Sequence, residues 1–170
     1  MAWDMMCDGK ELLLAENLDK FPDGTVDRAE LARRMMDNGQ ELSLAENLDK
    51  FPDDAVDEAE LARELMNRDV YGIETLVRNL DKFQPEAVDY SELARKLMDN
   101  GSYLFLASNL EKFPDGAVDH GELARRLLEF GLGGPYTLAK NLHKFQELPA
   151  DVRERLSASG SASSASTCFY

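Results

Sequence analysis

Apolar residues recur along the chain at helical spacing, and the pattern is repeated five times. In the first copy Leu14, Leu18 and Phe21 stand at i, i+4 and i+7, which places them on one face of a helix over Glu11–Phe21. The segment Asn-Leu-x-Lys-Phe inside this helix returns at steps of 30, 32, 30 and 32 residues. A fixed period of this length predicts a repeat architecture, in which each unit buries its apolar face against its neighbours.

A second helix is predicted in each unit. After Pro22 and Gly24 break the first helix, Asp27 and Glu30 have the spacing of a capping box at the start of the next one. This helix is expected to end near Asn38-Gly39. The same pair of acidic residues recurs at Asp57 and Glu60, at Asp89 and Glu92, and at Asp119 and Glu122.

The pattern predicts an all-α fold, a right-handed superhelix or solenoid of five antiparallel helical hairpins with about ten helices. We expect one helical-repeat domain over residues 1–156, with an N-terminal cap at 1–10 and a flexible Ser/Ala-rich tail at 157–170. The units fall near residues 11–40, 41–72, 73–102, 103–134 and 135–156. The steps of 32 residues are attributed to longer connections at 69–72 and 131–134, so that the units stack as pairs.

Composition narrows the classes of partner. The chain has 170 residues, 44% of them apolar, and a net charge of −14. Such a charge repels nucleic acids and anionic membrane surfaces, so a basic, cationic or neutral partner is expected. The two cysteines, Cys7 and Cys168, have no zinc-binding or disulfide spacing. Without an apolar stretch long enough to span a bilayer, the chain is predicted to be cytoplasmic.

Tandem amphipathic helix pairs with this period resemble the α-solenoid class, which includes TPR, HEAT and armadillo repeats. The resemblance covers roughly residues 1–157, although the Trp, Gly, Tyr and Pro landmarks of TPR units are absent. It implies a scaffold whose curved surface binds a peptide or another protein. Catalysis is not expected, because neither His120 nor His143 has a nucleophile at a suggestive spacing.

Two polar residues recur beside the apolar face of every first helix. The asparagines are Asn17, Asn47, Asn79, Asn109 and Asn141, and the lysines are Lys20, Lys50, Lys82, Lys112 and Lys144. Asparagine is a poor helix former in mid-helix, so its recurrence there requires an explanation. In one interpretation each amide bonds a neighbouring helix or an inter-repeat loop. In the other, the series forms a ladder that binds the backbone of an extended peptide, by resemblance to armadillo-like proteins. The lysines either stabilise helix C-termini or complete an Asn–Lys groove for carboxylates. Arginines that recur on the second helices are expected to pair with acidic neighbours; these are Arg33, Arg63, Arg95 and Arg125.

The turns between the helices are similar to EF-hand calcium loops, which need oxygen ligands in a tight turn. Matching carboxylates occur in units one and four, at Asp19, Asp23, Asp27, Glu30, Glu111, Asp115, Asp119 and Glu122. Phenylalanine replaces the ligand at the third loop position in every unit, and a capping box explains the same Asp and Glu spacing. Asp19, Asp49, Asp81 and Glu111 lie near helix C-termini, where a negative charge indicates either a site or an inter-repeat ion pair. The chain is predicted to have no cofactor, and weak calcium binding at these loops is the alternative.

The tail supports a further alternative, because its composition resembles the modified core of a ribosomally synthesised peptide precursor. In that interpretation the repeat domain is the leader, and enzymes that dehydrate or cyclise side chains are partners. The residues to be modified would be Ser161, Ser163, Ser164, Ser166, Thr167 and Cys168.

Overall fold

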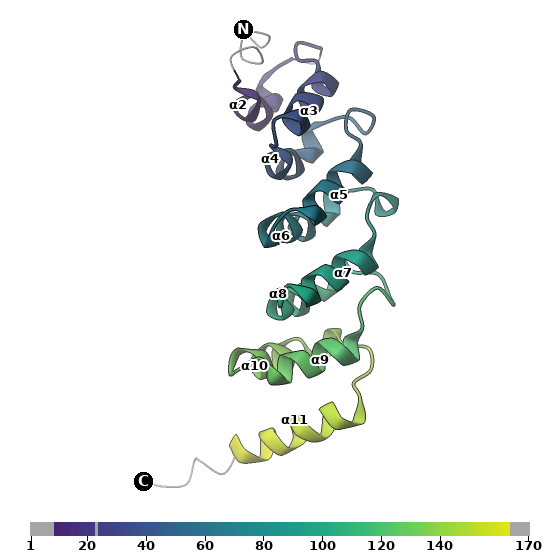
Figure 1. Cartoon of the computed structure of the whole chain (residues 1–170). Coiled ribbons are helices and arrows are strands. Elements are labelled where there is room, and N and C mark those ends of the chain that lie inside the picture. Colours follow the sequence, from purple (N-terminus) through teal and green to yellow (C-terminus); the bar gives the residue numbers. More distant parts are fainter. Residues whose placement is uncertain (1–8, 23, 164–170) are drawn as a thin grey trace, which may run out of the picture. The chain divides into compact units, whose positions relative to one another are not determined.

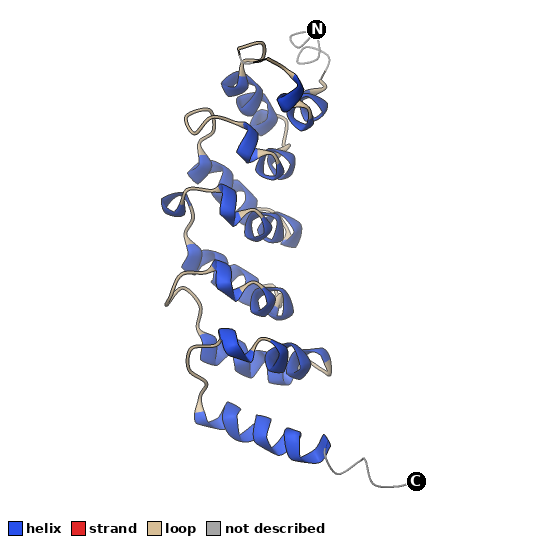
Figure 2. Ribbon diagram, turned by 180° about the vertical axis from the view of Figure 1, so that it is seen from behind, coloured by secondary structure: helices blue, strands red, loops and turns tan. Residues whose placement is uncertain are grey.

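The computed structural model describes residues 9–22 and 24–163, and within them helices are joined by loops and turns, with no strand (Figure 2). Ten α-helices, α2 to α11, fall in these ranges, so the predicted all-α fold is confirmed. Most of the N-terminal cap expected at 1–10 lies outside the described residues, and the handedness of the superhelix stays a prediction. Contacts between Cα atoms divide the chain into two compact units, residues 1–89 and 90–170.

Unit 1 contains the first two hairpins and the first helix of the third (Figure 1). The first helices α2, α4 and α6 pack side by side, while α3 packs on α2 and α4, and α5 packs on α4 and α6. A 3-10 turn follows each first helix. The elements are α2 (Glu11–Glu16), η1 (Leu18–Lys20), α3 (Arg28–Asp37), α4 (Glu41–Glu46), η2 (Leu48–Lys50), α5 (Glu58–Asn67), α6 (Val70–Arg78), η3 (Leu80–Lys82) and η4 (Pro85–Ala87).

Unit 2 repeats this arrangement. Helix α8 packs on α7, α9 and α10, and α9 also packs on α10 and α11. The elements are α7 (Tyr90–Asp99), α8 (Tyr103–Ser108), η5 (Leu110–Lys112), α9 (His120–Glu129), α10 (Gly133–Lys140), η6 (Leu142–Lys144) and α11 (Ala150–Ser163). Helix α11 therefore includes the first residues of the Ser/Ala-rich segment.

The core follows the sequence period. One leucine of each first helix has no exposed surface, and these leucines are spaced at 30 and 32 residues: Leu14, Leu44, Leu76, Leu106 and Leu138. Four second-helix leucines are equally buried, namely Leu31, Leu61, Leu93 and Leu123. Four of the recurring phenylalanines are also buried, at 5 to 9% exposure. Burying a leucine or phenylalanine contributes about 1.5–3 kcal/mol, so the stacked faces supply most of the driving force for folding.

The predicted caps are present at three second helices. The carboxylates of Asp27, Asp57 and Asp119 each accept a hydrogen bond from the backbone N–H three residues on, at 2.8 to 3.0 Å. A cap of this kind contributes about 1 kcal/mol. The second helices consequently begin where the sequence places them.

Two expectations about the first helices are wrong. The helix predicted over Glu11–Phe21 is α-helical only through Glu16 and continues as the 3-10 turn η1. The extra residues of the 32-residue steps lengthen helices rather than connections, because α6 and α10 have nine and eight residues whereas α2, α4 and α8 have six. A Cβ atom on Gly72 would overlap the carbonyl oxygen of Leu65, and one on Gly134 would overlap that of Leu127. Glycine therefore permits the close approach of these longer helices to the preceding second helix.

Candidate functional site

The five recurring asparagines share one geometry. Each is the C-terminal cap of its first α-helix, with φ between −103° and −114° and ψ between 13° and 17°. Each side-chain Nδ2 donates to the backbone carbonyl four residues earlier, at 2.8 to 3.0 Å. The acceptors are Leu13, Ser43, Thr75, Phe105 and Thr137. The asparagines thus stand where the α-helix ends, not in mid-helix, and the amide bonds its own helix.

This geometry explains why asparagine recurs. The change from α-helix to 3-10 turn falls at the asparagine. The carbonyls of Ser43, Thr75 and Thr137 also accept from the backbone N–H of the asparagine, so the amide is a second donor to them. At Asn17 and Asn109 the backbone N–H bonds the carbonyl three residues earlier, and the amide alone bonds Leu13 and Phe105 from that residue. Asparagine tolerates this backbone and bonds nearby backbone groups with its side chain. The residue therefore sets the bend at which the leucine and phenylalanine that follow turn into the core.

Three of the recurring lysines reach back to the preceding repeat. Lys50 Nζ donates to the carbonyl of Glu16 at 2.7 Å, and Lys144 Nζ donates to that of Ser108 at 2.9 Å. Lys82 makes the same bond to the carbonyl of Glu46. Each acceptor is the last residue of a first helix, where a cation also interacts favourably with the helix dipole. These lysines therefore link successive repeats within each unit.

The remaining two lysines, Lys20 and Lys112, differ in their exposure to solvent. Lys20 is exposed and donates to Oδ1 of Asn17 in its own repeat. Lys112 is half-buried at the matching position of unit 2.

Two carboxylates complete the inter-repeat links. Asp49 pairs with Lys82 at 2.8 Å, and Glu111 pairs with Lys144 at 2.7 Å. The hydrogen bond from Lys82 lowers the pKa of Asp49. Burial acts to raise the pKa of Glu111, but the hydrogen bond from Lys144 and further favourable contacts outweigh it and leave that pKa below its usual value. The sequence left open whether the carboxylates at helix C-termini mark a site or an inter-repeat ion pair. At Asp49 and Glu111 the structure has the inter-repeat ion pair.

Another linking position was not singled out from the sequence. This position is the first residue of the second helix, directly after the aspartate at its N-terminus. In the first four repeats it contacts the segment around the recurring phenylalanine of the following repeat. Arg28 donates to the carbonyl of Lys50 at 2.6 Å, and Glu58 accepts from the N–H of Gln84 at 2.6 Å. Its identity varies between repeats, so no recurring residue type marked it.

In unit 2 the same position carries aromatic rings. Tyr90 meets Phe113 edge to face, with ring centres 6.2 Å apart, and His120 meets Phe145 at 5.6 Å. The Nδ1 of His120 accepts from the N–H of Gln146 at 3.2 Å. Burial lowers the pKa of His120, against the opposing influence of the nearby acidic residues. The neutral imidazole is therefore the form that this packing favours.

The recurring arginines pair with acidic neighbours, as predicted. All four contact glutamates one turn away on their own helix: Arg33 with Glu30, Arg63 with Glu60, Arg95 with Glu92, and Arg125 with Glu122. Arg125 pairs with Asp151 at 3.2 Å.

Most of the described carboxylates of the EF-hand-like loops have partners of other kinds. Asp27 and Asp119 cap helices, Glu30 accepts from Arg33 and Arg34, and Glu122 accepts from Arg126. The hydrogen bond from Arg33, with that from Arg34, lowers the pKa of Glu30 to about 2. Asp115 accepts from the side chain of Gln146, Asp19 is exposed, and Asp23 lies outside the described residues. Across residues 9–22 and 24–163, no group of three or more His, Cys, Asp or Glu residues is arranged to hold a metal ion.

The tail residues named as modification candidates are divided by the end of the described range. Ser161 and Ser163 belong to the last turn of α11, while Ser164, Ser166, Thr167 and Cys168 lie outside the described residues. Modification of the tail stays a prediction.

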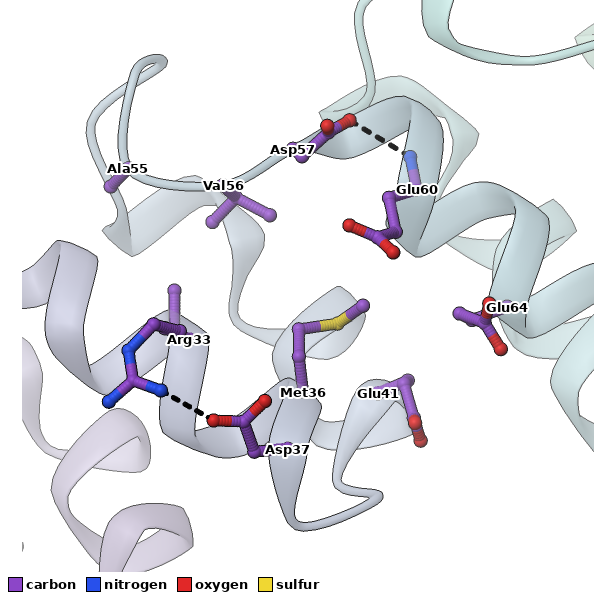
Figure 3. Close-up of a pocket in the computed structure, with 10 residues that line it drawn as sticks. Arg33, Met36, Asp37, Glu41, Ala55, Val56, Asp57, Glu60 and Glu64 are labelled. Carbon is purple, nitrogen blue, oxygen red and sulfur yellow. Dashed lines mark hydrogen bonds and ion pairs between the residues drawn. The ribbon is translucent and has the colours of Figure 1, made fainter.

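A groove in unit 1 lies between the second helices α3 and α5 (Figure 3). Its volume is about 380 Å³, at the small end of the roughly 300–1,000 Å³ typical of ligand pockets. The lining residues are Ala32, Arg33, Met36, Asp37, Glu41, Ala55, Val56, Asp57, Glu60 and Glu64. The groove carries both apolar and charged side chains.

The described residues form an all-helical structure in which neighbouring helices are in contact, an arrangement compatible with a helical repeat. No protein-family model, curated protein or solved structure matches the chain, so no family is assigned. Among the helices of the described ranges, none combines the length and the apolar character required to cross a membrane.

Proposed function

We propose that this chain is a non-catalytic helical-repeat scaffold that binds a protein or peptide partner. The observation that carries the proposal is the neighbour-to-neighbour packing of similar helical hairpins in each unit. Such packing aligns equivalent side chains on successive repeats, which gives repeat proteins extended binding surfaces. The net charge of −14 favours a partner with basic or neutral contact residues.

The Asn–Lys series has a packing role in this proposal. All five asparagine amides and the ammonium groups of Lys50, Lys82 and Lys144 already donate to the protein's own carbonyls. A peptide lying along this ladder would have to replace those bonds. The second-helix side, where charged residues are exposed, offers a surface without that competition.

The scaffold proposal is tested by identifying and reconstituting a partner. The tagged full-length chain is cross-linked in its native cells, and each recovered protein is then purified and titrated against the purified chain. We expect at least one stoichiometric complex with a measurable dissociation constant. If every candidate fails to bind when purified, or if the chain turns over a small molecule on its own, the proposal is wrong.

A further inference from the structure

The groove between α3 and α5 combines an apolar floor with an acidic rim. Ala32 is 2% exposed, while Met36 and Val56 are half-buried. Figure 3 shows the Met36 side chain extending from α3 toward α5, with Glu60 and Glu64 on the opposite wall. Methionine is flexible and polarisable, and it adapts to apolar side chains of different shapes.

Carboxylates predominate among the charged groups of the groove. Asp37, Glu41, Asp57, Glu60 and Glu64 line it together with one guanidinium, that of Arg33. Two more arginines pair with these carboxylates from its margin: Arg68 with Glu41, and Arg63 with Glu60 and Glu64. Even with these included, the carboxylates outnumber the guanidiniums by five to three. The local charge is thus negative in a chain that is acidic overall.

The rim carboxylates are accessible to a partner. The side chains of Asp37, Glu60 and Glu64 retain 61, 52 and 41% of their surface in water. Their ion pairs within unit 1 leave room for further donors, since a carboxylate offers about four acceptor positions. A lysine or arginine from outside can therefore join these pairs without displacing buried groups.

A related groove in unit 2 is a natural comparison. It is lined by Met98, Asp99, Tyr103, Glu122 and Arg126, each 62 residues after a lining residue of the unit 1 groove. Methionine and two of the acids are the same, but tyrosine replaces Glu41 and arginine replaces Glu64. The two grooves share the methionine and differ in charge. Of these two grooves, the one in unit 1 has the larger excess of carboxylates among its lining residues and is the better fit for a basic ligand.

We propose that the groove between α3 and α5 binds a basic, amphipathic segment of a partner protein. An apolar side chain of that segment lies against Met36, and flanking lysines or arginines contact Glu60 and Glu64. This inference rests on the scaffold proposal and names the chemistry of its partner. Charge complementarity at the rim steers the segment into the groove and sets its preference for basic sequences.

The test uses the full chain and a fluorescein-labelled peptide of about 12 residues with leucines at helical spacing and lysines elsewhere. Two control peptides replace all lysines by glutamate or all leucines by serine. The protein variant is Glu64→Arg, which copies the unit 2 residue; there the matching pair Arg126–Glu122, at 2.8 Å, is part of a folded helix. The matched control is Glu46→Arg, which makes the same charge change at an exposed residue of the first helix α4.

We expect the leucine-lysine peptide to bind with an affinity that falls as KCl is raised. Glu64→Arg should weaken binding about tenfold, as expected when one exposed attraction becomes a repulsion, and Glu46→Arg should change it less than about twofold. Both control peptides should bind more weakly. Circular dichroism of each variant establishes that the helices are retained.

Several outcomes would overturn the groove as the site. These are an equal loss of affinity in both variants, which indicates attraction to the overall charge, no loss in Glu64→Arg, or no peptide binding at all. A wild-type dimer in sedimentation that Glu64→Arg dissociates would assign the groove to a second copy of the chain. A native partner that binds Glu64→Arg as tightly as wild type would refute the groove yet leave the scaffold proposal standing.

Discussion

The inter-repeat lysine Lys82 gives the sharpest prediction about what holds the repeats together. Its ammonium group donates to the carbonyl of Glu46 and pairs with Asp49 at 2.8 Å. Replacing it by methionine keeps most of the apolar stem and removes both interactions. The substitution should therefore destabilise unit 1 without leaving a cavity in its core.

The expected loss follows from these two contacts. A hydrogen bond from a charged donor contributes about 1.5–3 kcal/mol when sheltered, and an exposed ion pair adds about 0.2–1 kcal/mol. The side chains of Lys82 and Asp49 retain 24 and 57% of their surface in water. Solvent screening therefore places the expected loss for Lys82→Met at about 1–2 kcal/mol.

The assay is urea unfolding followed by far-ultraviolet circular dichroism. With an m-value of about 2 kcal/mol/M, a loss of this size lowers the urea midpoint by about 0.5–1 M. Lys20→Met is the matched control, because Lys20 occupies the same repeat position but donates to Asn17 of its own repeat. That control should cost less than about 0.5 kcal/mol.

A double-mutant cycle with Asp49→Asn isolates the ion pair, and the double variant should lose less stability than the sum of the two single losses. If Lys82→Met and Lys20→Met have equal effects, the inter-repeat role of Lys82 is refuted. If Lys82→Met leaves stability intact and abolishes partner binding, the lysines belong to a ligand-binding ladder.

Three further predictions concern the core, a titrating side chain and metal binding. Leu97 has no exposed surface, so Leu97→Ala should lower the free energy of unfolding, measured in urea, by about 2–5 kcal/mol. Leu132 is 96% exposed, and Leu132→Ala should lower it by less than about 0.5 kcal/mol. Equal losses in the two variants would refute the assigned core. The pKa of His120 is lower in the folded protein than in the unfolded chain, where it is about 6.5. The neutral imidazole therefore stabilises the fold fully above a pH of about 6.5, and this stabilisation is lost as the pH falls through the folded-state pKa and the imidazole is protonated. The advantage of wild type over His120→Phe in thermal midpoint should therefore shrink on acidification, and a constant difference would contradict this. Millimolar Ca²⁺ should leave the thermal midpoint unchanged, since Asp27, Asp119, Glu30 and Glu122 are engaged in caps and ion pairs; a rise of several degrees would support the EF-hand interpretation.

The sequence predicted the parts of the fold that depend on local patterns. The leucine period and the aspartate caps at Asp27, Asp57 and Asp119 are signals contained in about ten consecutive residues. The sequence did not predict that the first α-helix of each repeat ends at its asparagine. The reason is that the run of apolar residues at i, i+4 and i+7 continues through the 3-10 turn that follows.

The linking contacts were harder to predict for a different reason. The acceptor of Lys50 is a backbone carbonyl 34 residues away, and for Lys82 and Lys144 it is 36 residues away. Backbone groups have no sequence signature. The acidic residues at helix C-termini correctly indicated an inter-repeat interaction, whereas the asparagine amides, expected to bond a neighbouring helix or loop, bond their own helices. The position occupied by Arg28 and His120 varies in chemistry, and its common role is visible only once the repeats are packed.

Amide hydrogen exchange along the full chain tests most directly whether the period encodes packed helical hairpins. The account predicts maxima of protection at the buried first-helix leucines Leu14, Leu44, Leu76, Leu106 and Leu138, recurring at 30 and 32 residues, with fast exchange in the turns between helices. Uniformly fast exchange at these leucines, or protection without that period, would contradict it.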